Sequence, residues 1–208
     1  MPNNPITDLM GVSVANVITS IKGSNLKQSG PLLITHWGMS GPAILKLSAF
    51  AARYLASLNY KFTAQINWLG INEGELRNCF EDLKQSRKLI YNLNPFKIPK
   101  RLWVYILKKL EISENQIYAD LGKKNKNRLI NALVNDEFIV NGKTTFKEEF
   151  VTCGGINLSE INMLTMESRR HKGIYFAGEI LNIDGVTGGF NFQAAWTTGY
   201  LAGKNCVL

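Results

Sequence analysis

The first part of the chain shows two hydrophobic spacings. Apolar and polar residues alternate within 6–21, in 32–35 and again over 61–69, which predicts three β-strands, each with one buried face. Before the third of these runs, apolar residues recur every three or four positions as far as Leu58. Pro42 fits the start of that helix, because the first helical position needs no N–H donor. We therefore expect a β-rich region that contains one helix.

The middle of the chain, from about Asn72 to Asn141, has a different pattern. Its apolar residues recur at helical spacing in four stretches that are separated by Pro, Ser or Gly. The predicted helices are 73–84, 100–110, 112–122 and 123–134. We interpret this part as a helical insert.

The last part, from Lys147 to Leu208, returns to short apolar runs between glycines. Strands are predicted at Phe150–Cys153 and Ile174–Ala177, and residues 156–161 would continue at the sheet edge. A helix is predicted after Phe190, and the small residues along it would allow close packing on the sheet. The whole chain is thus expected to have a mixed α/β fold.

The positive charge is concentrated in the middle of the chain. Of 24 Lys and Arg in the chain, 12 lie between Lys84 and Arg128, against three acidic residues, so this segment carries +9 while the whole chain carries +8. Such a segment could bind nucleic acid, an acidic partner or an anionic substrate. Cations spread over several short helices are more typical of a solvated surface. The charge pattern alone therefore disfavours nucleic acid as a partner.

A glycine-rich loop lies between the last predicted strand and the last helix. Gly178 and Glu179 follow the strand, where open α/β sheets place groups that contact ligands. Gly185, Gly188 and Gly189 lack a Cβ and allow backbone to approach a ligand closely. The helix that follows begins with unpaired N–H groups and the positive end of its dipole. This arrangement suits a phosphate or an electron-rich ring edge.

Four segments resemble one known family. They are THWGMSGP at 35–42, VTCGGI at 151–156, TMESR at 165–169 and IYFAGEILNIDGVTGGFNFQ at 174–193. In this order they are similar to motifs of the BaiN/YhiN-type NAD(P)/FAD-dependent oxidoreductases, the aminoacetone oxidase-like flavoproteins. The resemblance runs from about Pro5 to Lys204. It departs from the family pattern at Asn182, Arg169 and Phe190, where relatives usually carry Asp, Lys and Tyr.

The resemblance implies an architecture in three parts. Residues 1–71 would be the β-rich part of an inserted domain, a partial β-barrel, and 72–143 its helical subdomain. Residues 144–208 would be the C-terminal βα segment of an FAD domain of the two-dinucleotide-binding type. The G-x-G-x-x-G that holds the FAD pyrophosphate in such proteins does not occur here. We therefore interpret the chain as the C-terminal half of a longer flavoprotein, with the missing N-terminal half as its partner.

The resemblance also implies a cofactor and the residues that contact it. FAD would be the cofactor, NAD(P)H or a small organic molecule the hydride donor, and a small molecule the substrate. Glu179 would accept hydrogen bonds from ribityl hydroxyls, and the start of the last helix would face the pyrimidine edge of the flavin. The proposed cofactor-binding residues are Gly178, Glu179, Asp184, Gly185, Gly188, Gly189, Phe190 and Asn191.

Other residues give weaker indications. Three widely spaced cysteines and two histidines predict neither a disulfide framework nor a metal site. His36 is compatible with a catalytic or a structural role, and no catalytic residue is assigned. The chain has no apolar run long enough to span a bilayer and no signal-like start, so the cytoplasm is the expected location.

Two alternatives to an enzyme stay open. The basic insert could make the chain a non-enzymatic interaction or nucleic-acid-binding module, with retention on DNA that weakens as salt rises. The chain could also be a folded fragment without a function of its own. In that case we expect exposed apolar surface and self-association. By itself the chain is expected to be inactive as an oxidoreductase.

Overall fold

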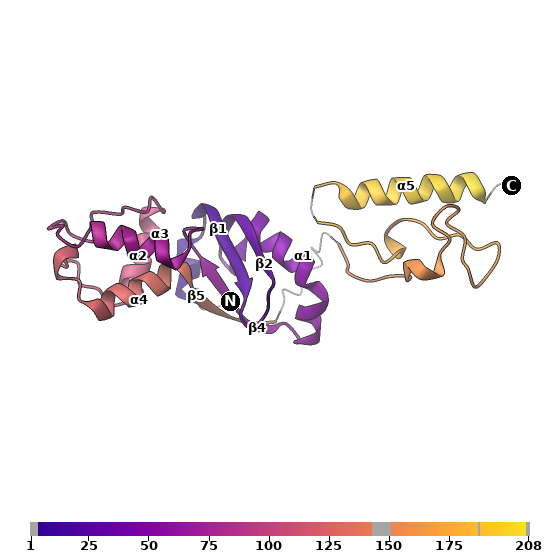
Figure 1. Ribbon diagram of the computed structural model, residues 1–208. Coiled ribbons are helices and arrows are strands. Elements are labelled where there is room, and N and C mark those ends of the chain that lie inside the picture. The colour runs from indigo at the N-terminus through magenta and orange to yellow at the C-terminus, as the bar shows by residue number, and fades with distance from the viewer. Residues whose placement is uncertain (1–3, 143–150, 187, 207–208) are drawn as a thin grey trace. The chain divides into compact units, whose positions relative to one another are not determined.

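A computed structural model describes residues 4–142, 151–186 and 188–206. These residues form two compact units, shown in Figure 1. The first unit contains the residues up to Leu47 together with 57–142, and the second contains Ser48–Ala56 together with the described residues from Val151 on. The two units are described in turn.

A five-stranded antiparallel sheet forms the first unit, with the order β3-β2-β1-β4-β5. Its strands are β1 (Ser13–Ile21), β2 (Lys27–Thr35), β3 (Gly38–Ser40), β4 (Lys61–Asn67) and β5 (Asp136–Asn141). Because β3 and β5 are edge strands of this sheet, the sheet is not closed into a barrel. The three strands expected from the alternating pattern correspond to β1, β2 and β4.

Two further strands were not expected from the sequence. The short strand β3 is only three residues long, and β5 lies in the part that was interpreted as helical. The β5 strand pairs with β4 from Asp136 opposite Ile66 to Asn141 opposite Lys61. The segment after the helices therefore returns to the sheet.

In the part of the chain that the structure describes, the first unit also contains four α-helices or portions of them. They are α1 (Pro42–Ser57), which continues into the second unit, α2 (Glu73–Asp82), α3 (Lys100–Lys109) and α4 (Lys123–Val134). Short 3-10 helices lie at Pro5–Leu9 (η1) and Tyr118–Asp120 (η2). In Figure 1, α2, α3 and α4 lie close together beside one end of the sheet. A single cluster of buried residues joins these helices to the sheet, with Trp103, Leu129, Ile66 and Phe138 among its members.

The expected helix at 112–122 is replaced by turns. Ile117 forms a bridge with Leu89, and the Ile90 N–H donates to the Gln116 carbonyl at 2.9 Å. The backbone groups that a helix would need are thus used in pairing with a neighbouring segment. Only the short η2 helix remains of this expectation.

The second unit is built from loops around one long helix, α5 (Phe190–Asn205). Two 3-10 turns, η3 (Leu158–Glu160) and η4 (Gly178–Ile180), lie within the loops. Its buried apolar cluster consists of Ile161, Met166 and Leu181 with partly buried neighbours. This core is small, so backbone hydrogen bonds hold much of the unit together.

The strands expected in the second unit are not formed. Phe150 lies outside the described residues, and 151–153 are irregular. In the expected strand Ile174–Ala177, Tyr175 makes only an isolated bridge with Glu167. The pairing with residues 166–168 is short: the Phe176 N–H donates to the Met166 carbonyl at 3.0 Å and the Ser168 N–H donates to the Ile174 carbonyl at 2.8 Å, which is too little to form a strand.

Candidate functional site

The glycine-rich loop and the start of α5 lie together in the second unit. Asn191, in the first turn of α5, connects them, because its Oδ1 accepts from the Gly185 N–H at 2.7 Å and its Nδ2 donates to the Gly185 carbonyl at 3.1 Å. A side-chain amide that bonds both groups of one residue fixes the position of that backbone. Asn191 therefore holds the loop against the helix.

Gly185 lies close to the start of α5. A Cβ at this position would lie 3.1 Å from the Phe190 Cβ and 3.3 Å from the Asn191 Oδ1. Contacts this short are tighter than ordinary packing, so Phe190 or Asn191 would have to shift by a few tenths of an ångström. The glycine therefore favours a close approach of the loop to the helix.

The start of α5 is open. Gly188 and Gly189 have φ angles of +117° and +90°, in the left-handed region that favours glycine. Gly189 is the N-cap, and within the described residues no side chain caps the helix. Phe190 is 60% exposed. The first N–H groups of α5 can thus donate to an acceptor from outside.

Gly178 and Glu179 are placed next to α5 by Thr198. The Gly178 N–H donates to the Thr198 Oγ1 at 3.0 Å, and that hydroxyl donates to the Ala194 carbonyl at 2.7 Å. Thr198 is buried, whereas Glu179 is exposed. The contact through Thr198 was not expected from the sequence, because a single Thr in a helix carries no distinguishing pattern.

A small cavity of about 150 Å³ lies between these elements. It is lined by Val151, Thr152, Gly178, Glu179, Ile183, Asn191, Ala194 and Ala195. Cavities that enclose whole cofactors are usually about 300–1,000 Å³. This cavity is therefore too small to enclose a dinucleotide.

Asp184 lies beside a cysteine rather than at the cavity. It accepts a hydrogen bond from the Cys153 thiol, and this bond, together with burial, raises the pKa of Cys153. Nearby, the Arg53 Nη2 donates to the Asn182 Oδ1 at 2.7 Å. Asn182 is one of the positions that depart from the family pattern, and its amide still pairs with a cation.

The two glycines of the VTCGGI segment have unequal roles. Gly154 and Gly155 both have positive φ angles, of +126° and +136°. A Cβ at Gly154 would contact nothing within 4 Å, whereas one at Gly155 would lie 2.5 Å from the Ile180 carbonyl oxygen. On the next residue, the Ile156 N–H donates to that same oxygen at 2.9 Å. Gly155 therefore allows this segment to pack directly against η4.

The structure brings most of the predicted site residues together. Gly178, Glu179 and Asn191 line one cavity, and Gly185 is bonded to Asn191. His36 belongs to the first unit, where it lies on the exposed turn between β2 and β3 with its ring centroid 5.3 Å from that of Trp37.

The described residues also include the cysteines and the helices that bear on disulfides, metal sites and membrane spans. Cys79, Cys153 and Cys206 are free thiols. No group of three or more His, Cys, Asp or Glu among the described residues is arranged to hold a metal ion. None of the described helices is both long and apolar enough to cross a bilayer.

The candidate site and the first unit are both similar to known proteins. The chain is 31% identical over 200 residues to a ribosomal RNA dihydrouridine synthase of Escherichia coli, covering 96% of this chain and 47% of the relative. The protein of the same name from Haemophilus influenzae is 29% identical, with 94% and 46% covered. A 3-dehydro-bile acid delta(4,6)-reductase of Clostridium scindens is 27% identical, with 97% and 50% covered.

These curated relatives are about twice as long as the region of similarity, so the chain spans about half their length. Residues 2–151 match a family model described as the HI0933-like protein barrel and H2TH domain. The match contains the open sheet and the helices of the first unit. This chain therefore belongs to the HI0933-like family of flavoprotein oxidoreductases.

Proposed function

We propose that the chain provides one wall of the FAD site in a flavin-dependent reductase. The observation that carries the proposal is the start of α5, with left-handed Gly188 and Gly189 and a loop held by Asn191. A flavin presents carbonyl oxygens and ring nitrogens along its pyrimidine edge, which match N–H donors. The donors at this helix start and the open space beside Gly189 fit that edge.

Bound FAD would supply the hydride transfer. The residues of this chain would orient the ring and stabilise negative charge on its pyrimidine edge through the N–H groups of the first turn of α5. Asn191 acts as a positioning residue, because its amide is bonded to Gly185 and is not free for the cofactor. Glu179, which is exposed beside the cavity, would accept hydrogen bonds from ribityl hydroxyls.

The names of the relatives support a reaction class for the proposal. One relative is named a dihydrouridine synthase and another a delta(4,6)-reductase, and both names fit reduction of a carbon–carbon double bond. We infer the same class for the whole protein, with NAD(P)H as the reductant that restores the reduced flavin. The division at 71 and 143 is retained as the proposed arrangement of inserted domain, helical subdomain and FAD-domain segment.

A fluorescence titration tests this function. Adding the full chain to FAD should change flavin emission saturably, and Asn191→Ala should weaken the effect because the loop is released. Gln193→Ala is the matched control, since Gln193 pairs only with Thr197 on the exposed surface of α5. A folded chain that leaves FAD emission unchanged at every concentration, or an Asn191→Ala variant that behaves like the control, would contradict the proposal.

A further inference from the structure

A large cavity lies in the first unit, and none of its lining residues belongs to the proposed flavin site. It is a cleft of about 880 Å³ between η1, α3 and the start of β5. The cleft is lined by Asn4, Pro5, Asp8, Leu9, Lys100, Arg101, Val104, Tyr105, Lys108, Lys109, Glu137 and Phe138. Its size is in the range that holds a whole small ligand.

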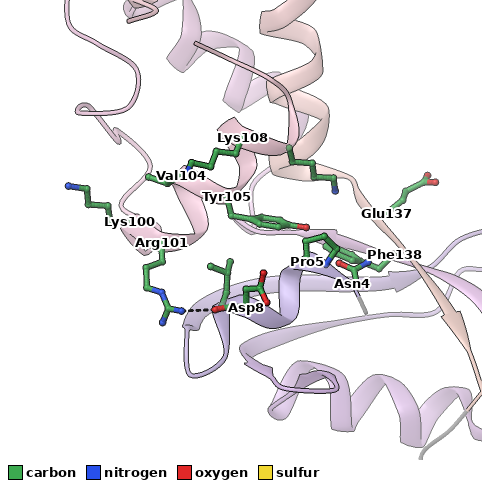
Figure 2. Close-up of a pocket in the computed structure, with 12 residues that line it drawn as sticks. Asn4, Pro5, Asp8, Lys100, Arg101, Val104, Tyr105, Lys108, Glu137 and Phe138 are labelled. Carbon is green, nitrogen blue, oxygen red and sulfur yellow. Dashed lines mark hydrogen bonds between the residues drawn. The ribbon is translucent and has the colours of Figure 1, made fainter. Parts of the chain in front are cut away.

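One face of α3 alternates charge and apolar surface along the cleft. Three pairs of adjacent residues form this face, and successive pairs are four positions apart along the helix. They are Lys100 and Arg101, Val104 and Tyr105, and Lys108 and Lys109. From the first to the last pair the helix rises about 12 Å. Cations therefore lie at both ends of an apolar middle section, where Figure 2 shows the Tyr105 ring between the Lys108 side chain and Pro5.

Most of these cations are not neutralised by carboxylates in the described residues. Lys109 is paired with buried Asp136. Arg101 donates to two backbone carbonyls, at 2.7 Å to Asp8 and 3.4 Å to Met10, so it keeps its full charge. The described residues include no salt bridge of Lys100 or Lys108.

The placement of Lys100 and Arg101 is unfavourable for the helix itself. Both lie in the first turn of α3, where the dipole favours negative charge, and this turn contains no acidic residue. Pro99 is the N-cap and makes no side-chain capping bond. A bound anion beside this turn would reverse the unfavourable interaction.

The apolar part of the cleft suits a flat ring. Tyr105 is partly buried, and burial, with the negative charges of Asp136 and Asp8, raises its pKa to about 12, so the phenol is neutral at ordinary pH. Phe138 is buried below it. Aromatic side chains of this kind stack with nucleic-acid bases, and the carboxylate of Asp8 can accept a hydrogen bond from a base N–H.

We propose that this cleft binds a single-stranded segment of RNA, with phosphates at Lys100 and Lys108 and a base stacked on Tyr105. This proposal rests on the proposed reductase function, and RNA is chosen among anionic ligands because two relatives are named for ribosomal RNA. The cleft itself supplies charge complementarity and a stacking surface. Single strands fit best because their bases are free to stack. The α3 cleft would hold the RNA substrate, and it would use other residues than those proposed to contact the flavin.

Binding of a labelled oligouridine to the full chain, measured by fluorescence anisotropy at several salt concentrations, tests the phosphate contacts. The double variant Lys100→Gln, Lys108→Gln should weaken binding at least about tenfold and lower the slope of log affinity against log salt by about 1.4, or 0.7 for each phosphate contact on a single strand. The matched control is Lys27→Gln, Lys61→Gln, which removes the same charge from exposed strand ends. Equal weakening in both double variants would overturn the proposal.

A second comparison tests the stacking contact. The chain should bind oligouridine about tenfold more tightly than an abasic oligomer with the same phosphates, since stacking of one base contributes roughly 1–3 kcal/mol. Tyr105→Leu should remove this preference, and Tyr105→Phe should keep it. A preference for duplex DNA over oligouridine would contradict the proposal.

Measuring FAD emission with the same variants separates the two proposals. If oligouridine binding fails while FAD emission still responds to the chain, only the cleft proposal is wrong. If FAD emission does not respond while oligouridine binds as expected, only the flavin proposal is wrong.

Discussion

The two units of this protein reach their structures in different ways. The first has a continuous core of buried side chains that joins an open sheet to three helices. The second has a small cluster of buried apolar residues, Ile161, Met166 and Leu181, and is shaped by glycines and backbone hydrogen bonds. Side-chain packing therefore determines the first unit, whereas close backbone contacts determine the unit that carries the candidate flavin site.

The two units also differ in the exposure of their large aromatic side chains. On α5 of the second unit, Phe192, Trp196 and Tyr200 are each at least 66% exposed, and they lie four residues apart along one face. In the first unit, Trp68 and Trp103 are buried. The second unit thus leaves large apolar side chains in solvent, which fits a wall that other protein or cofactor surface covers.

The largest effect is expected from removing the cation that pairs with the buried carboxylate of Asp136 in the first unit. Lys109→Met should lower its free energy of unfolding by about 3–5 kcal/mol, because it leaves the buried carboxylate of Asp136 without its cation. Urea denaturation followed by tryptophan fluorescence measures this change. Lys108→Met is the control, since Lys108 is exposed on the same turn and has no salt bridge among the described residues. Equal loss in both variants would mean that the pair is not what stabilises this region.

In the second unit, the substitution expected to destabilise the structure most is one that adds a methyl group at Gly155. Gly155→Ala would place a Cβ 2.5 Å from the Ile180 carbonyl oxygen, so the segment must shift, at a cost of several kcal/mol locally. Hydrogen exchange at the amides of Ile156 and Asn182, which are bonded across this contact, should become much faster. Gly154→Ala has similar backbone strain but open space, and should change exchange far less.

A smaller effect is expected from the loop anchor. Asn191→Ala removes both hydrogen bonds to Gly185 and should cost about 1–2 kcal/mol of local stability. Exchange of the Gly185 amide measures it directly. The first unit should keep its stability, because neither hydrogen bond involves it. Unchanged exchange of the Gly185 amide in Asn191→Ala would contradict the anchoring role.

The smallest effect concerns pH. Desolvation raises the pKa of Asp136, and Lys109 and Trp68 oppose that shift. Because the folded state then holds its proton more tightly than the unfolded state, the free energy of unfolding should fall as pH rises from about 4 through the raised pKa. Asp136→Asn should remove this slope, which denaturation at a series of pH values measures. A slope that is unchanged in the variant would exclude Asp136 as its source.

Because the units differ in this way, the secondary structure of the first unit is easier to predict from the sequence than that of the second. Helix α4 is found at the predicted 123–134, and α1 begins at Pro42 as expected. These elements bury regular apolar stripes, and such stripes are visible in a sequence. The strand β5 was missed because it follows directly after α4 and is short and partly polar.

In the second unit the sequence indicated which residues lie close together better than it indicated their backbone conformation. The glycines and Asn191 do gather at the start of α5, but the expected strand at 174–177 is an isolated bridge. The contacts that shape this region, such as Gly178 to Thr198 and Gly155 to Ile180, join residues far apart in the chain. No local pattern reports such contacts. The cleft on α3 was also invisible, because its opposite walls come from η1 and β5.

The central claim is that the start of α5 and its loop form a flavin wall. We would titrate the isotopically labelled chain with FAD and follow its backbone amides by NMR. The claim predicts saturable shifts at Gly185, Gly188, Gly189 and Asn191, with the amides around the α3 cleft unchanged. Shifts confined to the α3 cleft, or none in a folded chain at millimolar FAD, would contradict it.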